Sequence, residues 1–275
     1  MKIAKVEELK EIAKKIRIDI IDEIYNAQSG HPGSSLSLVE ILTVLYFNEM
    51  NIDPNDAKSP SRDRLVLSKG HAAPALYATL AERGYFPKEE LKTLRQIDSP
   101  LQGHPNAEKL QGIDASTGSL GQGLSIANGM ALASKMDEMG YRVYCIVGDG
   151  EIEEGQIWEA CMTASKYKLD NLCLIVDANK LQLTESTENV KNIQYEDIEQ
   201  KLRSFGFNTL IIDGNDIESV MSAFSKAEEM KEMPTAIIAR TTKGKGVSFM
   251  ENNVIWHGKA PNQEEYEKAI IELNK

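Results

Sequence analysis

Hydrophobic residues follow two different rhythms along the chain, and the first of them is helical. Near the N-terminus, isoleucines recur every four positions from Ile12 to Ile24, which predicts a helix over residues 6–28. The tetrapeptide 37–40 (SLVE) has the pattern of a capping box, so we expect it to open a helix that runs toward Met50. The N-terminal part of the chain is therefore predicted to be helical.

From residue 64 onward, short aliphatic runs alternate with helical patterns. Such runs are typical of strands buried on both faces, and their alternation with helices favours a parallel sheet covered on both sides. The expected strands are 64–68, 142–147, 172–176, 209–212 and 236–240. The expected helices are 74–83, which Gly84 ends, 121–139, 156–168, 195–205 and 217–230. We therefore predict an α/β fold, a single doubly wound domain over residues 1–275 with helical additions at its N-terminus.

Composition and charge narrow the classes of function. The 275 residues include 31 basic and 42 acidic ones, and the net charge of −11 argues against a nucleic-acid partner. The N-terminal segment lacks the uncharged core of a signal peptide, and no apolar run approaches the ~18 residues of a membrane span. We expect a cytoplasmic protein without membrane contact. The odd number of cysteines and their spacing suit neither a disulfide framework nor a metal knuckle, so we expect buried, unreactive side chains.

Polar, glycine-rich segments follow four of the expected strands. Because ligands bind beyond the carboxyl ends of strands in open parallel sheets, we expect these segments to form one binding rim. The segments are 69–72 (KGHA), 148–151 (GDGE), 177–180 (DANK) and 241–246 (TTKGKG).

The segment around Asp149 suggests a bound cation. Its flanking glycines let a backbone approach a phosphate closely, but the carboxylate itself would repel one unless a cation lay between them. Asn179, at the end of the next strand, adds an amide oxygen, and hard oxygen ligands suit Mg²⁺ or Ca²⁺ rather than zinc. In the alternative interpretation, Asp149 caps a helix and Asn179 forms a turn. Neither a Rossmann fingerprint nor a Walker A loop is present.

All four histidines lie in glycine-bearing segments. A single loop histidine is usually a surface residue, but four in such settings favour a role in proton transfer. They are His31 in SGHPG, His71 in KGHA, His104 in GHP and His257 in WHG. His104 belongs to a long irregular stretch, 98–117, and compact domains rarely tolerate such a stretch without a function.

At these positions the sequence resembles the N-terminal, diphosphate-binding part of transketolases, which are thiamine-diphosphate enzymes. The similarity covers nearly the whole chain in family order, and its histidine strings are more specific than the GDG pattern. The matching strings are SGHPG (29–33), SKGHA (68–72), GHP (103–105), STGSLGQG (116–123), GDGEIEEG (148–155), DANKLQL (177–183), DGND (213–216), TKGKG (242–246) and WHG (256–258).

The resemblance implies a thiamine-diphosphate-binding fold and a role for each matching residue. For the metal, Mg²⁺ with Ca²⁺ or Mn²⁺ as alternatives, it implies Asp149, Asn179 and the carbonyl of Leu181. For thiamine diphosphate it implies Gly150, Asn179, His71, Lys243 and His257 as binding residues, with Gly118, Ser119 and Leu120 along the middle of the cofactor. For the reacting carbon and the sugar hydroxyls it implies His31, His71, His104 and His257. Glu154 is implied to belong to the cofactor-binding set and to lie near a subunit contact, where it couples paired sites.

Two departures from the family pattern stand out. Many members have Gly-Pro-Leu where this chain has Gly118, Ser119 and Leu120. Full-length transketolases also continue into a pyrimidine-binding domain and a C-terminal domain, which we expect on a partner chain. The resemblance thus implies the N-terminal subunit of a split transketolase, assembled as two copies of each chain.

The reaction implied is transfer of a two-carbon ketol unit from a ketose phosphate to an aldose phosphate. The alternatives are a deoxyxylulose-phosphate synthase fragment, the α subunit of a 2-oxo-acid dehydrogenase, or a cofactor-binding module without catalysis. Retention of the histidines and of the Asp149–Asn179 pair argues against the last of these.

Overall fold

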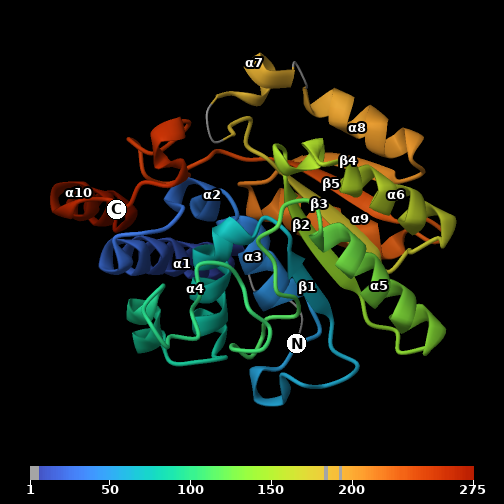
Figure 1. Cartoon of the computed structure of the whole chain (residues 1–275), viewed down its shortest axis with the longest axis horizontal. Helices are drawn as coiled ribbons and strands as arrows, with labels where there is room; N and C mark the ends of the chain where they lie inside the picture. The colour runs from blue at the N-terminus through green and yellow to red at the C-terminus, as the bar shows by residue number, and fades with distance from the viewer. Residues whose placement is uncertain (1–5, 183–184, 192–193) are drawn as a thin grey trace.

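The computed structural model describes residues 6–182, 185–191 and 194–275, and a five-stranded sheet lies at its centre (Figure 1). All neighbouring strands run parallel, in the order β1-β2-β3-β5-β4. The strands are β1 (Arg64–Leu67), β2 (Val143–Gly148), β3 (Leu172–Ala178), β4 (Asn208–Asp213) and β5 (Thr235–Arg240). The predicted parallel sheet is confirmed, with every expected strand present to within two residues.

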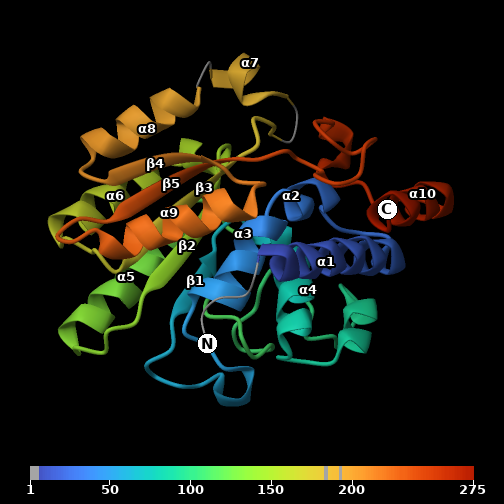
Figure 2. The same ribbon diagram turned by 180° about the vertical axis from the view of Figure 1, so that it is seen from behind.

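Helices cover both faces of the sheet, which confirms the doubly wound arrangement (Figures 1 and 2). One hydrophobic core joins a face of the sheet to α1 (Val6–Ala27), α3 (Val39–Val44), α4 (Ala73–Arg83) and α9 (Ile217–Glu229). The other face shares a core with α5 (Gly123–Met136), α6 (Gly155–Lys166) and α8 (Tyr195–Ser204). Cys145 and Cys173 lie in these cores, and with Cys161 they are buried and free, as expected.

The remaining elements complete the described part of the chain. They are α2 (Pro32–Leu36), the π-helical η1 (Leu45–Glu49), the 3-10 turns η2 (Pro54–Asp56), η3 (Gly70–Ala72), η4 (Lys88–Thr93), η5 (Glu151–Glu153) and η6 (Val254–His257), α7 (Thr187–Lys191) and α10 (Gln263–Leu273). The long helices have the predicted positions, and Gly84, at φ 94°, ends α4 in the left-handed conformation. Among the described residues, no helix is both long enough and apolar enough to cross a membrane.

The capping box expected at residues 37–40 is wrong. Helix α3 begins after Leu38 without a side-chain cap, and the π-helical η1 ends the helical path at Glu49. The Ser37 hydroxyl instead donates to the Ser34 carbonyl at 3.1 Å and to Asp177 Oδ2 at 2.7 Å. A buried carboxylate is a stronger acceptor than a neutral group, so this long-range contact takes the place of the local cap.

Helix α10 was not among the predicted helices, although its start carries a capping signal. Asn262 accepts from the backbone N–H of Glu265, and Glu265 accepts from the backbone N–H of Asn262, both at 2.9 Å. This reciprocal pair satisfies two backbone donors of the first turn.

Glu23 on α1 is a carboxyl group buried between helices. It is 1% exposed, and neither of its oxygens has a hydrogen-bond partner among the described residues. Burial, together with the charges of Asp19 and Asp22, raises the pKa of Glu23 well above its usual range. The folded chain therefore favours the protonated form of this side chain.

Replacing Glu23 with glutamine is expected to stabilise the fold by an amount that grows with pH. The unfolded chain releases the Glu23 proton near pH 4.5. The folded chain retains that proton to higher pH, so wild-type stability falls as pH rises, by at most about 1.4 kcal/mol per pH unit. Glutamine has the same shape and no charge, which removes this dependence. Urea unfolding between pH 5 and 8 measures the difference, with Glu11→Gln, at an exposed position of α1, as the control. A stabilisation that does not change with pH would contradict the prediction.

Candidate functional site

Three of the four polar segments that follow strands line one cavity, and Lys243 of the fourth segment contacts its wall through the Leu181 carbonyl and His257 Nδ1. Because β4 lies at the edge of the sheet, β1, β2, β3 and β5 are consecutive, and their carboxyl ends lie side by side. The register pairs Gly148 with Asp177 and Ala178 with Arg240, so the three longer strands end together. The cavity of about 350 Å³ is lined by His31, Ser34, Lys69, His71, Gly118, Leu120, Gly148, Asp149, Gly150, Glu151, Asn179, Leu181, Gln182 and His257.

Asp149, Asn179 and Leu181 place three kinds of oxygen on the wall of this cavity. Asp149 Oδ1 accepts from the backbone N–H of Gly150 at 2.9 Å, and its Oδ2 accepts from that of Lys180 at 2.6 Å. Asn179 Oδ1 accepts from the N–H of Leu181 at 3.1 Å. These bonds fix the orientation of the carboxylate and of the amide oxygen.

The oxygen atoms on this wall could coordinate a hard divalent cation, but a bound ligand would have to supply the remaining oxygens. Within the described ranges, no three histidine, cysteine or acidic side chains gather into a metal-binding group. One carboxylate, one amide oxygen and one carbonyl are hard ligands, but they leave places that phosphate oxygens would fill. The Leu181 carbonyl already accepts from a cation, the Lys243 ammonium, at 3.3 Å.

Three of the four histidines form a triangle over the cavity. Their ring centroids are separated by 5.3 Å (His31–His71), 5.5 Å (His31–His257) and 5.4 Å (His71–His257). The three rings come from the start of α2, from the turn after β1 and from η6, which are far apart in the sequence. The fold therefore assembles a group that sequence spacing alone does not place together.

These three imidazoles are held neutral. Burial is the largest cause, and nearby cations add to it, so the pKa falls to about 4 for His31, about 2 for His71 and about 3 for His257. The contributing cations include Lys69 and Lys243, and burial also lowers the pKa of Lys243 to about 8. Neutral imidazoles each offer one donor and one acceptor to a ligand.

The structure places His104 beside the triangle, on an exposed loop. Its ring packs against Gly118, where a Cβ atom would lie 3.0 Å from His104 Cγ. Gly118 has φ 140°, so glycine is required there for both its backbone conformation and its close approach. The Tyr77 hydroxyl donates to the carbonyls of Gln102 (2.8 Å) and His104 (3.2 Å), which anchors the loop.

Ser119 and Glu154 lie outside the cavity lining. Both are exposed, whereas Gly118 and Leu120 on either side of Ser119 line the cavity. Glu154 precedes α6 and packs against Gly121, where an added Cβ would lie 2.6 Å from the Glu154 Cβ. Glu154 is thus on the outer surface, beside the loop that covers the cavity.

Asp177 is a buried charged residue that the sequence analysis did not single out. Its carboxylate accepts from Lys69 Nζ at 2.5 Å, from Asn179 Nδ2 at 3.1 Å, and from the hydroxyls of Ser37 and Thr241. Burial by itself would raise the pKa of Asp177, but Lys69 and the hydroxyl donors bring it below its usual value. An aspartate at the end of the aliphatic run LCLIV was the available signal.

Glu151, which lines the cavity, is a second buried carboxylate that accepts several hydrogen bonds. Its Oε1 accepts from the Ser68 hydroxyl at 2.5 Å and from the Gly121 N–H at 2.9 Å, while Oε2 accepts from Gly148 N–H at 3.1 Å. One buried carboxylate thus joins the ends of β1 and β2 to the loop before α5.

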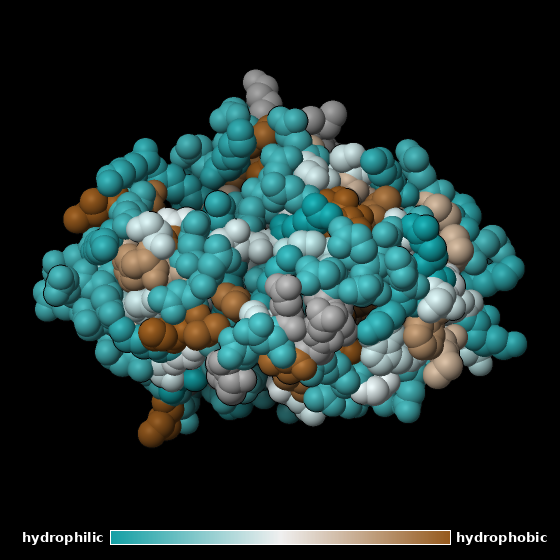
Figure 3. Space-filling model, turned by 90° about the horizontal axis from the view of Figure 1, so that it is seen from above, coloured by the Kyte–Doolittle hydropathy of each residue, from teal (hydrophilic) through white to brown (hydrophobic). Residues whose placement is uncertain are grey.

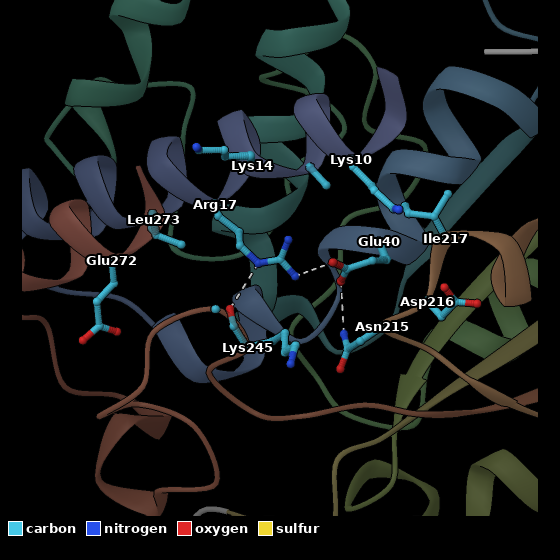
Figure 4. A pocket seen from close by; sticks show the side chains of 12 residues that line it. Lys10, Lys14, Arg17, Glu40, Asn215, Asp216, Ile217, Lys245, Glu272 and Leu273 are labelled. Atoms are coloured by element: carbon cyan, nitrogen blue, oxygen red, sulfur yellow. Dashed lines mark hydrogen bonds and ion pairs between the residues drawn. The ribbon is translucent and has the colours of Figure 1, made fainter. Parts of the chain in front are cut away.

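A second cavity, of about 330 Å³, lies behind the loop that carries Lys243 (Figure 4). There, Arg17 donates to Glu40 Oε1 at 2.5 Å and to the carbonyl of Lys245 at 3.1 Å, and Asn215 donates to Glu40 Oε2 at 3.1 Å (Figure 4). Asn215 also accepts from the backbone N–H of Thr242 at 2.8 Å. The DGND segment therefore helps to hold the Lys243 loop from the side away from the histidines.

A family model described as "Transketolase, thiamine diphosphate binding domain" matches residues 8–273. The chain belongs to the transketolase family.

Relatives within the transketolase family fall into two length classes. The chain is 42% identical over 270 residues to a subunit of apulose-4-phosphate transketolase from Phocaeicola vulgatus, covering 98% of this chain and 95% of that protein. It is 44% identical to 6-deoxy-6-sulfo-D-fructose transketolase subunit SqwG of Clostridium, covering 98% and 97%. It is also 46% identical to human transketolase, of which it spans only 42%.

The fold agrees with solved transketolase structures. Transketolase from Campylobacter jejuni superposes with a TM-score of 0.89 at 33% sequence identity, over 98% of this chain and 43% of that one. The thiamine-diphosphate-binding α/β fold expected from the sequence is therefore confirmed.

Proposed function

We propose that this chain is the cofactor-binding subunit of a two-chain transketolase that moves a two-carbon ketol unit from a ketose phosphate to an aldose phosphate. The observation that carries the proposal is the cavity at the ends of the adjacent strands β1, β2 and β3. It brings hard oxygen groups together with three neutral histidines, in a chain of the transketolase family.

The proposed metal is Mg²⁺, with Ca²⁺ or Mn²⁺ as alternatives of the same ligand preference. Asp149, Asn179 and the carbonyl of Leu181 would hold it. The carboxylate and amide are oriented by backbone N–H donors, so these two groups need little reorganisation on binding, whereas the Leu181 carbonyl would exchange the Lys243 ammonium for the metal. Gly150, Asn179, His71, Lys243 and His257 would bind the diphosphate, with Gly118, Ser119 and Leu120 beside the middle of the cofactor.

When bound, thiamine diphosphate supplies the nucleophilic carbon that carries the two-carbon unit. The protein's own contribution is to orient, to exclude water and to move protons. Neutral His31, His71 and His257 can donate to a sugar oxygen as negative charge develops on it, or accept a hydroxyl proton. His104 would add a fourth such group from the adjacent loop.

The proposed partner is a separate chain with the remaining transketolase domains, assembled as two copies of each. Two relatives named as subunits match this chain over nearly their whole length, whereas human transketolase is matched over 42%. Apolar side chains available for such a contact are exposed on α5, on α6 and just before α5: Leu120 (39%), Ile126 (38%) and Met162 (54%). Glu154 lies at the start of α6 in the same region. We also propose a cytoplasmic location.

Hydrophobic residues are also exposed elsewhere on the surface. Figure 3 shows a face on which hydrophilic residues predominate and hydrophobic residues form several separate groups. The α5–α6 region is favoured as the contact because it adjoins the cavity through Gly118 and Leu120.

The test is a turnover assay of the purified chain, alone and with the candidate partner chain, thiamine diphosphate and Mg²⁺. We expect ketol transfer only when both chains are present. The donor panel should contain phosphorylated and sulfonated ketoses, since the two relatives are named for different sugars, and pyruvate. Appreciable transfer by the chain alone would refute the two-chain site. Preference for pyruvate would favour a synthase-like or 2-oxo-acid dehydrogenase-like enzyme, and cofactor binding without turnover on any donor would favour a non-catalytic module.

A further inference from the structure

Arg95 connects two histidine-bearing loops that are far apart in the sequence. It follows η4, and its Nη1 donates to the Ser29 hydroxyl at 2.9 Å. Its Nη2 lies 3.4 Å from His31 Nδ1 and donates to the carbonyl of Gly103 at 3.4 Å. One guanidinium therefore contacts both the SGHPG and the GHP segments, beside the cavity rather than in its lining.

The contact with His31 has a definite chemical consequence. A guanidinium has only donors and stays protonated, so the imidazole nitrogen that faces it must be an acceptor. In a neutral histidine the proton then resides on the other ring nitrogen. We propose that Arg95 is a positioning residue that holds His31 in the Nε2–H tautomer and thereby gives the cavity a hydrogen-bond donor at this ring.

The surroundings of Arg95 are arranged for this contact. Within the part of the chain that the structure describes, no carboxylate forms an ion pair with Arg95, so its charge is not neutralised locally. At Gly103, an added Cβ would lie 3.3 Å from Arg95 Nε, so the small residue leaves room for the guanidinium. Arg95 itself has φ 59°, a left-handed conformation that is unfavourable for a residue with a side chain and needs support from its contacts.

His257 shows the same arrangement with a different cation. Its Nδ1 lies 2.8 Å from the Lys243 ammonium, which also has only donors. Two histidines of the triangle thus present Nδ1 to a positive group. Because Nδ1 is the acceptor in both rings, the geometry places the proton of each neutral ring on Nε2.

The charge on Arg95 also keeps His31 neutral. Burial is the main cause of the low pKa of His31, about 4, and Arg95 is the largest of the charges that act on it. The other groups facing His31 are His104, Lys243 and Lys69, which lower its pKa further, and the rings of His71 and His257. A neutral ring with a fixed tautomer can donate to a substrate oxygen without first losing or gaining a proton.

The proposal is tested on the ligand-free full chain by ¹⁵N NMR of the histidine side chains, assigned with single His→Gln variants. A single Nε2–H tautomer gives two well-separated nitrogen resonances, and a mixture brings them together. We expect His31 to be almost entirely Nε2–H in the wild type. A wild-type His31 in the Nδ1–H form would overturn the proposal without any variant of Arg95.

Three variants separate hydrogen bonding, charge and loop anchoring. Arg95→Met should mix the His31 tautomers and move its titration to higher pH. Arg95→Lys keeps the charge but cannot span Ser29, His31 and Gly103. In this variant His31 should still titrate at low pH, but its tautomers should mix. Tyr77→Phe removes anchoring bonds of the GHP loop without contacting His31, and should leave the tautomer unchanged. A His31 ring that does not respond to Arg95→Met would refute the proposal.

The functional consequence rests on the proposed role of His31 in ketol transfer. In the two-chain complex we expect Arg95→Met to lower kcat by roughly 10- to 100-fold, the usual cost of losing an orienting partner. The NMR result does not depend on turnover. A changed tautomer with unchanged kcat would therefore count against the role of His31, not against the contact.

Discussion

Replacing Asp149 with asparagine is expected to lower the affinity for thiamine diphosphate in the presence of Mg²⁺ by about 100-fold or more. Loss of an outer-shell partner of a metal ligand costs roughly 10- to 100-fold, and loss of a ligand's charge should cost at least as much. The amide retains one oxygen that can accept from the Gly150 or Lys180 N–H, so the fold should be little affected. Calorimetric titration of the chain with its partner, with thiamine diphosphate and Mg²⁺, measures the change.

Asp213→Asn is the matched control for this prediction. Asp213 ends β4, the edge strand of the same sheet, and its carboxylate accepts from the Asn215 N–H at 2.9 Å. It does not line the cavity, so the same chemical change should leave cofactor affinity unaltered. Equal losses in both variants, or no loss in Asp149→Asn, would exclude the proposed cation at Asp149.

Replacing Asp177 with alanine is expected to destabilise the fold by about 3–5 kcal/mol, because it would remove the ion-pair partner of the buried Lys69 ammonium. The side chains of Lys69 and Asp177 are only 2% and 0% exposed, so solvent screens their interaction little. The hydroxyls of Ser37 and Thr241 would lose their acceptor as well. Urea unfolding monitored by circular dichroism measures the loss.

Asp170→Ala provides the comparison from the opposite end of the same strand. Asp170 precedes β3 and pairs with Lys135 at 2.7 Å, with side chains that are 19% and 35% exposed. A partly solvated pair of this kind contributes about 0–1 kcal/mol, so the loss should be several times smaller than for Asp177→Ala. Similar losses at the two positions would show that burial does not determine how much the Lys69–Asp177 pair stabilises the fold.

Local sequence patterns predicted the elements of this fold because each element depends on neighbouring residues. The isoleucine spacing placed α1, the aliphatic runs placed the strands, and Gly84 ended α4. The predicted capping box at residues 37–40 was wrong because the hydrogen bond of Ser37 depends on a residue far away in the sequence. The Ser37 hydroxyl donates to the carboxylate of Asp177, and a pattern of four adjacent residues carries no information about this distant acceptor.

The order of residues was enough to predict which side chains follow the strands. It therefore predicted that Asp149, Asn179 and Lys243 would lie at the carboxyl ends of the strands. Side-chain chemistry and the direction of a parallel strand suffice for that. Which strand ends are adjacent could not be predicted in this way, because the position of β4 at the edge is set by packing of the helices on both faces.

The contacts that prepare the site for chemistry also depend on the tertiary structure. Arg95 reaches His31 and Asp177 accepts from Lys69 across 64 and 108 positions of the chain. No local propensity encodes such a pair, since its geometry depends on how separate helices and strands pack. The sequence supplies the acids, bases and cations of the site, and packing determines which of them face each other.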